Sequence, residues 1–196
     1  MDEKTATRDR ILEAAMNRIK HYGYGKTTMA EIAADCSMSP GNIYRFFEAK
    51  IDIAEAMARK YNAERLASLA AITRNKTLPP GKKLRELLLS RLRESFEMFQ
   101  ASAKILEVAN VLSTERPLFM NELLAQERVL ISAIIEEGIA TGEFAAGDAE
   151  FAAEMVQAAT IKFSVPQMFS QLTLQKLERE FEGVLRLLLN GLNVRA

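Results

Sequence analysis

Two helix-start signals lie close together in the first quarter of the chain, and they limit what it can fold into. Thr28 is followed three residues later by Glu31, the spacing of a capping box, in which each side chain satisfies a backbone N–H at a helix start. Ser39 is a second N-cap candidate, and Pro40 suits the first helical position because its missing N–H costs nothing there. The pattern predicts two short helices, the second over residues 40–46, which neighbouring helices must hold in place. A short, supported helix of this kind is suited to insertion into the major groove of DNA.

Helical spacing of apolar residues extends over nearly the whole chain, and no alternating strand pattern of useful length is present. The chain is therefore predicted to be all-α. A long helix follows Lys50 and should end near residue 72, because the Pro-Pro-Gly sequence within residues 73–82 cannot continue a helix. Besides this helix and the two short ones, helices are expected over residues 7–22, 83–100, 103–114, 117–140, 148–164 and 174–192.

The charges give only local support for a polyanionic partner. Lys+Arg and Asp+Glu number 26 each, so the net charge favours neither sign. Up to Lys50 there are eight cations and seven anions, a net charge of +1. Their placement is more informative, because Lys26, Arg45 and Lys50 all lie at helix ends that border the two short helices.

Several classes of function lack the residues they need. The one cysteine, Cys36, allows neither an intramolecular disulfide nor a multi-cysteine metal site, and it fits a reducing cytosol. The lone His21 has no evident acid or nucleophile partner, and no phosphate loop or metal-ligand spacing is present. No signal peptide and no apolar run of about twenty residues is present. We therefore expect a cytoplasmic protein that is not an enzyme, uses no cofactor or metal and contacts no membrane.

Residues 8–53 resemble the N-terminal DNA-binding domain of the TetR/AcrR family of transcriptional regulators. The expected number of helices, with a long fourth one, matches the architecture of that family. The resemblance implies a three-helix helix-turn-helix DNA-binding domain at residues 1–53 and a helical ligand-binding and dimerisation domain at residues 54–196. It is carried, in the order and spacing of the family, by Thr28, Ile32, Ala33, Ser39, Gly41, Ile43, Tyr44, Phe47 and Lys50.

The sequence departs from the family pattern at three positions. Ser37 stands where the family usually has glycine in the turn, so it must adopt a left-handed conformation or bend the turn differently. Phe46 replaces a common His or Tyr, which removes a polar phosphate contact. Ala49 replaces the usual capping residue at the start of the long helix. These changes affect single contacts and leave the expected fold intact.

The resemblance implies that the third helix enters the major groove of double-stranded DNA. Gly41 allows the backbone to approach the duplex, while Asn42 suits adenine and Arg45 suits guanine. Tyr44, Lys50 and the two threonines before the second helix are expected to hold phosphates, near a helix N-terminus that favours anions. Capping alone is an alternative for Thr28, and a solvated face is one for Arg45. The predicted DNA-binding residues are Lys26, Thr27, Thr28, Ser39, Pro40, Gly41, Asn42, Tyr44, Arg45 and Lys50, whereas Ile32, Ala33, Ile43 and Phe47 are expected in the core.

The last two helices are predicted to form a symmetric homodimer through a four-helix interface. The final helix has a wide apolar stripe, and the preceding one has small residues that permit close approach of another helix. The stripe consists of Leu174, Leu177, Phe181, Val184 and Leu188, widened by Leu185, Leu189 and Leu192, and the small residues are Ala152, Ala153, Ala158 and Ala159. A dimer would present paired helices to successive major grooves, about 34 Å apart.

Aromatic and methionine residues between the long helix and this interface are candidates for the wall of a ligand pocket, with an ordinary core as the alternative. Gln157, Thr160 and Ser164 share one helical face, so they either orient a ligand or form hydrogen bonds across the dimer. The predicted ligand-binding residues are Phe96, Phe99, Asn110, Phe119, Gln157, Thr160 and Phe163. By resemblance, a small, largely apolar effector would shift the long helix and release DNA.

The function that these features favour is that of a ligand-responsive repressor, which binds a palindromic operator as a homodimer. The alternative is a helical protein-interaction module that has the same fold but no longer binds DNA, and the nearly neutral N-terminal region keeps that alternative open.

Overall fold

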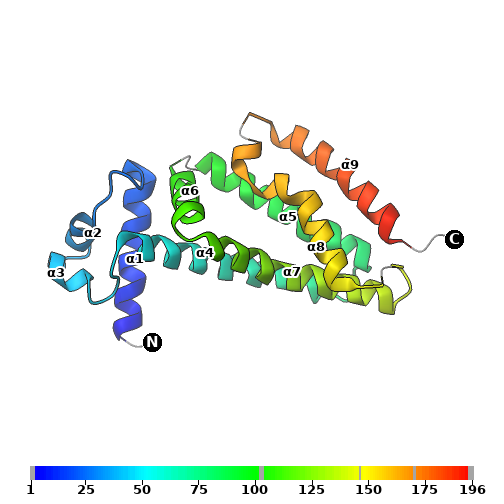
Figure 1. Cartoon of the computed structure of the whole chain (residues 1–196), viewed down its shortest axis with the longest axis horizontal. Coiled ribbons are helices and arrows are strands. Elements are labelled where there is room, and N and C mark those ends of the chain that lie inside the picture. Colours follow the sequence, from blue (N-terminus) through cyan, green and yellow to red (C-terminus); the bar gives the residue numbers. More distant parts are fainter. Residues whose placement is uncertain (1–2, 102–103, 146, 170, 194–196) are drawn as a thin grey trace. The chain divides into compact units, whose positions relative to one another are not determined.

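The computed structural model describes residues 3–101, 104–145, 147–169 and 171–193, and within these ranges it contains helices and no β-strand. This confirms the all-α prediction. The helices are α1 (Glu3–Tyr22), α2 (Met29–Asp35), α3 (Pro40–Ile43), α4 (Lys50–Thr73), α5 (Pro80–Ala101), α6 (Ile105–Glu115), α7 (Pro117–Ala140), α8 (Ala149–Thr160) and α9 (Leu174–Leu192), with the 3₁₀ turns η1 (Ile161–Ser164) and η2 (Pro166–Met168) after α8 (Figure 1).

Several helix boundaries differ from the expected ones for local reasons. The Pro-Pro-Gly sequence separates α4 from α5, and it also begins α5. Pro80 occupies the first position of α5, and Gly81 lies inside that helix. A Cβ at Gly81 would lie 2.7 Å from the carboxylate of Glu143, so that flexible side chain would have to shift. The helix expected over residues 148–164 ends at Thr160 and continues only as the tighter η1. Residue 103, the expected start of α6, lies outside the described residues.

Contacts divide the chain into two compact units. The N-terminal unit comprises Met1–Ala63 with Ala101–Asn121, and the C-terminal unit comprises Glu64–Gln100 with Glu122–Ala196. The division therefore falls inside α4, and α6 packs in the N-terminal unit although the sequence division at residue 53 assigns it to the second domain. The functional division at residue 53 stays a prediction.

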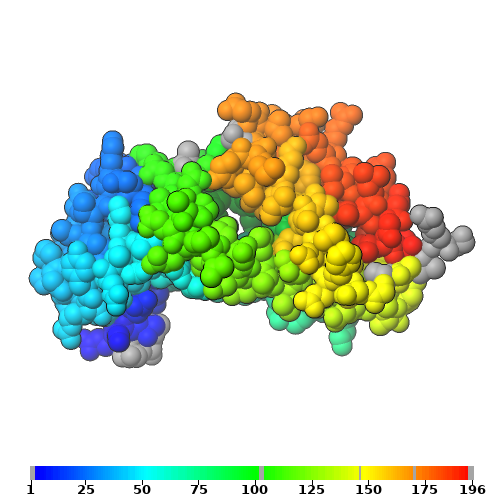
Figure 2. Space-filling model, in the orientation of Figure 1, coloured from blue at the N-terminus to red at the C-terminus, as the bar shows by residue number. Residues whose placement is uncertain are grey.

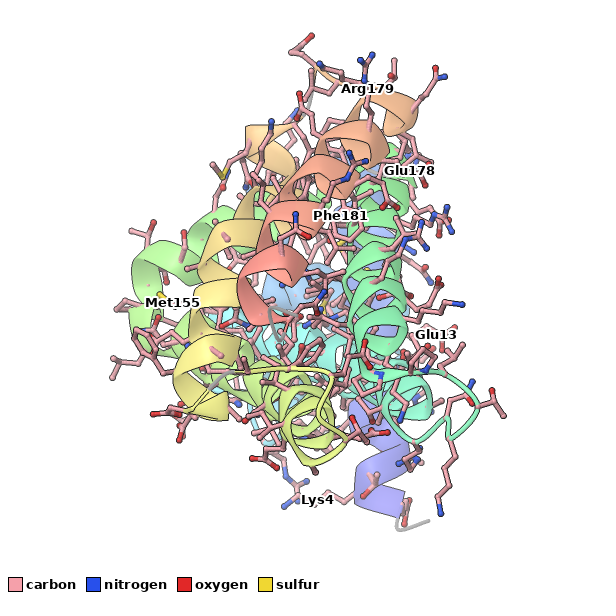
Figure 3. The ribbon with its side chains drawn as sticks, turned by 90° about the vertical axis from the view of Figure 1, so that its right-hand side faces the viewer. Lys4, Glu13, Met155, Glu178, Arg179 and Phe181 are labelled. Atoms are coloured by element: carbon pink, nitrogen blue, oxygen red, sulfur yellow. The ribbon has the colours of Figure 1, made fainter. Side chains whose placement is uncertain are left out.

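The C-terminal unit is a bundle in which α9 packs along α5 and α8. Arg93 Nε on α5 donates to Glu178 on α9 at 2.7 Å, and the rings of Phe163 and Phe181 meet edge to face at 5.7 Å. Phe181 points from α9 into the bundle, whereas Arg179 points away from it (Figure 3). Most of the apolar stripe of α9 therefore serves the core of its own unit: Leu177, Phe181 and Leu185 are buried, and Leu174, Val184, Leu188, Leu189 and Leu192 pack partly buried against that core.

Local caps explain where α8 and α9 begin. The side chain of Asp148 accepts from the N–H of Phe151 at 3.0 Å. The side chain of Thr173 accepts from the N–H of Lys176 at 3.2 Å. Each cap satisfies one of the N–H groups that have no partner in the first turn of a helix.

Gly138 on α7 leaves room for the ring of Phe144, and filling that room should destabilise the fold. A Cβ at Gly138 would lie 2.0 Å from Cδ2 of Phe144 and 2.5 Å from Cε2. Gly138→Ala is expected to lower the free energy of unfolding by about 1–3 kcal/mol, because the buried ring must move. Chemical denaturation measures this loss.

The control is Gly191→Ala on α9, where an added Cβ meets nothing within 4 Å. Alanine should raise stability there by up to about 1 kcal/mol through its higher helix propensity. Equal stability of Gly138→Ala and the wild type would show that Phe144 swings aside without cost and would contradict the prediction.

Candidate nucleic-acid interface

The start of α2 contains the predicted capping box. The Thr28 hydroxyl accepts from the N–H of Glu31 at 3.3 Å, and the Glu31 carboxylate accepts from the N–H of Thr28 at 2.9 Å. The carboxylate also accepts from the Thr28 hydroxyl at 2.8 Å. Hydrogen bonds from Thr28, together with nearby Arg18, hold the pKa of Glu31 below its usual value. Thr28 is exposed while it caps, so its hydroxyl stays at the surface.

In the turn between α2 and α3, Ser37 adopts the left-handed conformation and does not bend the turn differently. Its φ is 55°, in the left-handed region. Backbone hydrogen bonds from Ser37 N to Ala34 O and from Met38 N to Ala33 O, both 2.9 Å, hold the turn. A left-handed non-glycine residue costs about 1–2 kcal/mol, which these bonds and the packing of the neighbouring helices offset.

Helix α3 is shorter than predicted. Ser39 is the N-cap residue, as predicted, with extended backbone, but its side chain makes no capping hydrogen bond. Pro40 is the first helical residue, as expected. The helix ends at Ile43 and does not reach Phe46, because the N–H of Arg45 bonds to Asn42 O at 3.1 Å and that of Phe46 to Ile43 O at 3.0 Å. Bonds of this spacing tighten the chain into turns.

Burial separates the supporting side chains of α3 from those that face solvent. Ile43 is fully buried, and Phe47 beyond the helix is 3% exposed, so both belong to the core as predicted, with Ile32 and Ala33 of α2. Tyr44 is 52% exposed, and Arg45 is exposed beside it. Asn42 is half-buried. Lys26, Ser39, Pro40 and Gly41 are exposed, and the position of a Cβ at Gly41 meets nothing within 4 Å.

Thr27 and Lys50 form contacts inside the unit, and the phosphate contacts predicted for them stay a prediction. Thr27 is fully buried, and its hydroxyl donates to Gly23 O at 2.9 Å. The half-buried Lys50 donates from Nζ to Tyr24 O at 2.7 Å and to Thr27 O at 2.8 Å, and lies 4.1 Å from the centre of the Tyr24 ring. Burial lowers the pKa of Lys50, although nearby carboxylates oppose the shift. Both side chains hold the loop before α2.

Nearby residues contact the chain at the two other departures from the family pattern. Ala49 has no capping side chain, but its N–H donates to the carboxylate of Asp52 at 2.9 Å. The carbonyl of Phe46 accepts from Arg8 Nη1 at 2.6 Å, and the Arg8 guanidinium stacks 4.1 Å from the centre of the Phe47 ring. Arg8 of α1 thus fixes the segment after α3, a role that no local sequence signal indicated.

Three charged residues at the ends of α6 bind the helix-turn-helix region, and sequence reasoning missed all three. Lys104 donates to His21 O, at the end of α1. The carboxylate of Glu107 accepts from Gly25 N at 3.3 Å. Arg116 forms ion pairs with Asp52 at 2.9 Å and Glu55 at 3.2 Å. These partners are far apart in the sequence, so spacing gives no indication of them.

The predicted ligand-binding aromatic residues do not form one group. Phe96 and Phe99 on α5 both pack against Phe169, each with a ring-centroid distance of 6.3 Å, and Phe163 is in the core of the same unit. Phe119 belongs to the N-terminal unit, where it is buried 4.7 Å from the guanidinium of Arg59. Asn110 belongs to that unit as well, exposed on α6. The ligand-binding role of these residues stays a prediction.

The two predicted polar residues, Gln157 and Thr160, are buried in a cluster of charges. Arg91 on α5 donates to Glu127 Oε1 on α7 at 2.5 Å and to the hydroxyl and carbonyl of Thr160 at 2.7 and 2.9 Å. Arg65 on α4 donates to the other Glu127 oxygen at 2.5 Å, and Gln157 Nε2 donates to Leu124 O at 3.0 Å. Burial alone would raise the pKa of Glu127, but the guanidinium groups of Arg91 and Arg65 hold it below its usual value.

Comparison with known proteins places both parts of the chain in one family. Residues 11–57 match the model described as bacterial regulatory proteins, tetR family, and residues 80–185 match the tetracyclin repressor-like C-terminal domain. These matches cover more than half of the chain, so the protein belongs to the TetR family of bacterial transcriptional regulators, as the sequence resemblance indicated. Regulators of this family are generally transcription factors without enzymatic activity.

Solved structures of regulators share the fold. A TetR/AcrR-family transcriptional regulator from Thermobifida fusca YX-ER1 is 26% identical with a TM-score of 0.71, and the match covers 94% of this chain and 97% of that one. SmeT, the repressor of the Stenotrophomonas maltophilia multidrug efflux pump SmeDEF, is 18% identical with a TM-score of 0.72, covering 100% and 94%. A search of curated proteins finds no match. Among the residues that the structure describes, no helix is long and apolar enough to cross a membrane.

Proposed function

We propose that this regulator is a repressor, which binds a palindromic operator as a homodimer and is released by a small effector with a largely apolar body. The observation that carries the proposal is the division of α3 and its following turn into a buried and an open side. Ile43 and Phe47 anchor the segment, while Tyr44 and Arg45 face solvent next to Gly41. Arg45 has the donors to read guanine in the major groove, and the Tyr44 hydroxyl can hold a phosphate.

The proposed dimer uses the outer surfaces of α8 and α9. Figure 2 shows these helices adjoining on one face of the C-terminal unit. Phe151 and Met155 on α8 are 60% and 42% exposed, and Leu187 on α9 is 74% exposed. Met155 points outward in Figure 3. Ala158 and Ala159 are also exposed and would let a partner helix approach closely. A contiguous patch of such apolar side chains would mark an interaction surface.

The effector part of the proposal has support from a relative. A complex of SmeT with triclosan has been solved, and SmeT has the same fold at 16% identity, with a TM-score of 0.69 over 97% of this chain and 93% of that one. We extend ligand binding to the C-terminal unit of this chain, where Phe96, Phe99 and Phe169 provide aromatic surface.

Arg45 provides the direct test of DNA binding. Genome-wide capture of DNA fragments on the full-length protein should recover an enriched palindrome, and binding to it should weaken as salt rises. Arg45→Ala should reduce the affinity for this site at least about tenfold, because a bidentate contact to a base is worth about 1–3 kcal/mol. Fluorescence anisotropy of the labelled palindrome measures the change.

The matched control is Arg74→Ala, which removes an exposed arginine of the C-terminal unit and should leave the affinity within about twofold. If no fragment is enriched, the repressor proposal fails, and a helical interaction module that no longer binds DNA becomes the better description. The net charge of only +1 up to Lys50 is the observation that favours this second candidate.

A further inference from the structure

One arginine of the N-terminal unit is tied to the chain just after α3, 38 residues away in the sequence. Arg8 lies on the side of α1 that carries the buried Ile11 and Ala15, in keeping with helical spacing. Its Nη1 donates to Phe46 O at 2.6 Å, and its guanidinium lies 4.1 Å from the centre of the Phe47 ring. The segment between α3 and α4 therefore runs beside α1 (Figure 1).

The carbonyl that Arg8 holds belongs to the tight turn that follows α3. The four residues of α3 are too few to form a stable helix alone. Behind that carbonyl, the N–H of Phe46 bonds back over only three residues, to Ile43 O at 3.0 Å. The last carbonyls of a helical segment lack a partner within it. Arg8 supplies a partner for Phe46 from another helix, and a charged donor makes a stronger hydrogen bond than a neutral one.

Arg45 comes directly before this fixed carbonyl. Its side chain is exposed, whereas the guanidinium of Arg8 packs over Phe47, which is only 3% exposed. An arginine reads guanine through two N–H donors that must meet the base together. Groups that bind in this way have to be held within about 0.5 Å of the productive geometry by the residues behind them. The hydrogen bond from Arg8 provides such support for the backbone next to Arg45.

We propose that Arg8 is a positioning residue for DNA recognition, which acts through Arg45 by fixing the backbone of the segment that carries it. The guanidinium of Arg8 faces Phe46 O and the Phe47 ring, so Arg45 and not Arg8 meets the duplex. The inference rests on the proposed function, because it names a residue that the reading of the operator requires.

The first test measures the affinity of full-length variants for the captured palindrome by fluorescence anisotropy. Arg8→Met keeps a long side chain over Phe47 but removes the donor, so it should weaken operator binding at least about tenfold. Arg8→Lys keeps a charged donor and should bind at least about threefold more tightly than Arg8→Met. Wild-type affinity in Arg8→Met, or an Arg8→Lys variant that binds no better than Arg8→Met, overturns the proposal.

The matched control is Arg10→Met. Arg10 is exposed two residues further along α1, and residues two apart on a helix do not share a side. This variant loses the same charge as Arg8→Met but no bond to the segment after α3, so its operator affinity should stay within about threefold of wild type. A loss in Arg10→Met as large as that in Arg8→Met would show an effect of charge alone and would overturn the proposal.

Two further measurements separate positioning from direct contact and from general destabilisation. The slope of log affinity against log salt should be the same in Arg8→Met as in wild type, whereas loss of a phosphate contact reduces it by about one. In the background of Arg45→Ala, Arg8→Met should change the affinity by no more than about twofold, because residues that act as one unit are not additive. A slope reduced by about one, or fully additive losses, overturns the proposal.

The variants are expected to fold. Arg8 is half-buried and borders a hollow of about 350 Å³, whose walls also include Glu48 and Ala56, so a methionine there does not crowd the core. If Arg8→Met does not fold, the shorter Arg8→Leu takes its place in every comparison, with the same deciding outcomes.

The same samples separate this inference from the proposed function. If wild type and Arg8→Met bind the palindrome equally well, the repressor proposal stands and only the role of Arg8 is refuted. If wild type captures no palindrome, the repressor proposal itself fails, and the role of Arg8 fails with it.

Discussion

Glu127→Ala is expected to lower the free energy of unfolding by about 3–5 kcal/mol, because it leaves the guanidinium groups of Arg91 and Arg65 without their carboxylate. Arg91 is 1% exposed and cannot regain water without opening the bundle. Urea denaturation followed by circular dichroism gives the loss. Glu127→Gln, which keeps the shape but removes the charge, should also be destabilising.

The control is Glu154→Ala, an exposed glutamate on α8, which should stay within about 0.5 kcal/mol of wild type. A pH series adds a second readout. The pKa of Glu127 is lower in the folded state than its ordinary value, so the ionised group contributes stability above about pH 4.3, and this contribution is lost as the pH falls through the folded-state pKa. Wild type should therefore lose more stability on acidification than Glu127→Gln. Equal losses would mean that the cluster does not stabilise the unit.

Leu187→Glu is expected to convert the proposed dimer into a monomer and to reduce operator affinity by about 10²–10⁴-fold. Leu187 is 74% exposed on α9, and a symmetric interface would bury one glutamate from each copy close to its like-charged counterpart. A monomer binds each half of a palindrome separately and loses the gain in effective concentration that linked reading helices have. Sedimentation equilibrium gives the mass, and anisotropy gives the affinity.

Val129→Glu is the matched control for the dimer. Val129 is 67% exposed on α7, outside the proposed interface, so the same substitution there should leave both mass and affinity unchanged. A Leu187→Glu protein that remains a dimer at micromolar concentration would place the interface elsewhere on the surface. Should Val129→Glu dissociate instead, α7 would be the better candidate.

Features set by local chemistry could be predicted from the sequence, and features set by distant partners could not. The capping box of Thr28 and Glu31 involves neighbouring residues, and the start and end of α9 were found at the expected positions. Ser39 occupies the expected N-cap position, but the residue type alone did not show that its side chain makes no hydrogen bond to the helix. The contacts of Thr27 and Lys50 inside the unit could not be predicted, because a polar residue beside a DNA-reading helix can bind its own backbone as well as a phosphate.

The polar face of α8 shows the same limit in the C-terminal unit. Its spacing showed that Gln157 and Thr160 share one side of the helix, but it gave no sign that Arg91 and Glu127 meet them there. These residues come from three separate helices. Side-chain pairing over such separations follows from packing, which a periodicity does not encode.

The position of α6 implies that the DNA-binding unit is not formed by one continuous segment of the chain. Lys104, Glu107 and Arg116 contact the end of α1, the loop before α2 and the first turns of α4. A fragment cut after α3, or one extended only into α4, would leave those carbonyls, N–H groups and carboxylates facing water. When effector domains are exchanged between regulators of this kind, the α6 that comes with the new domain must therefore match the N-terminal unit. This requirement makes the two domains evolve together.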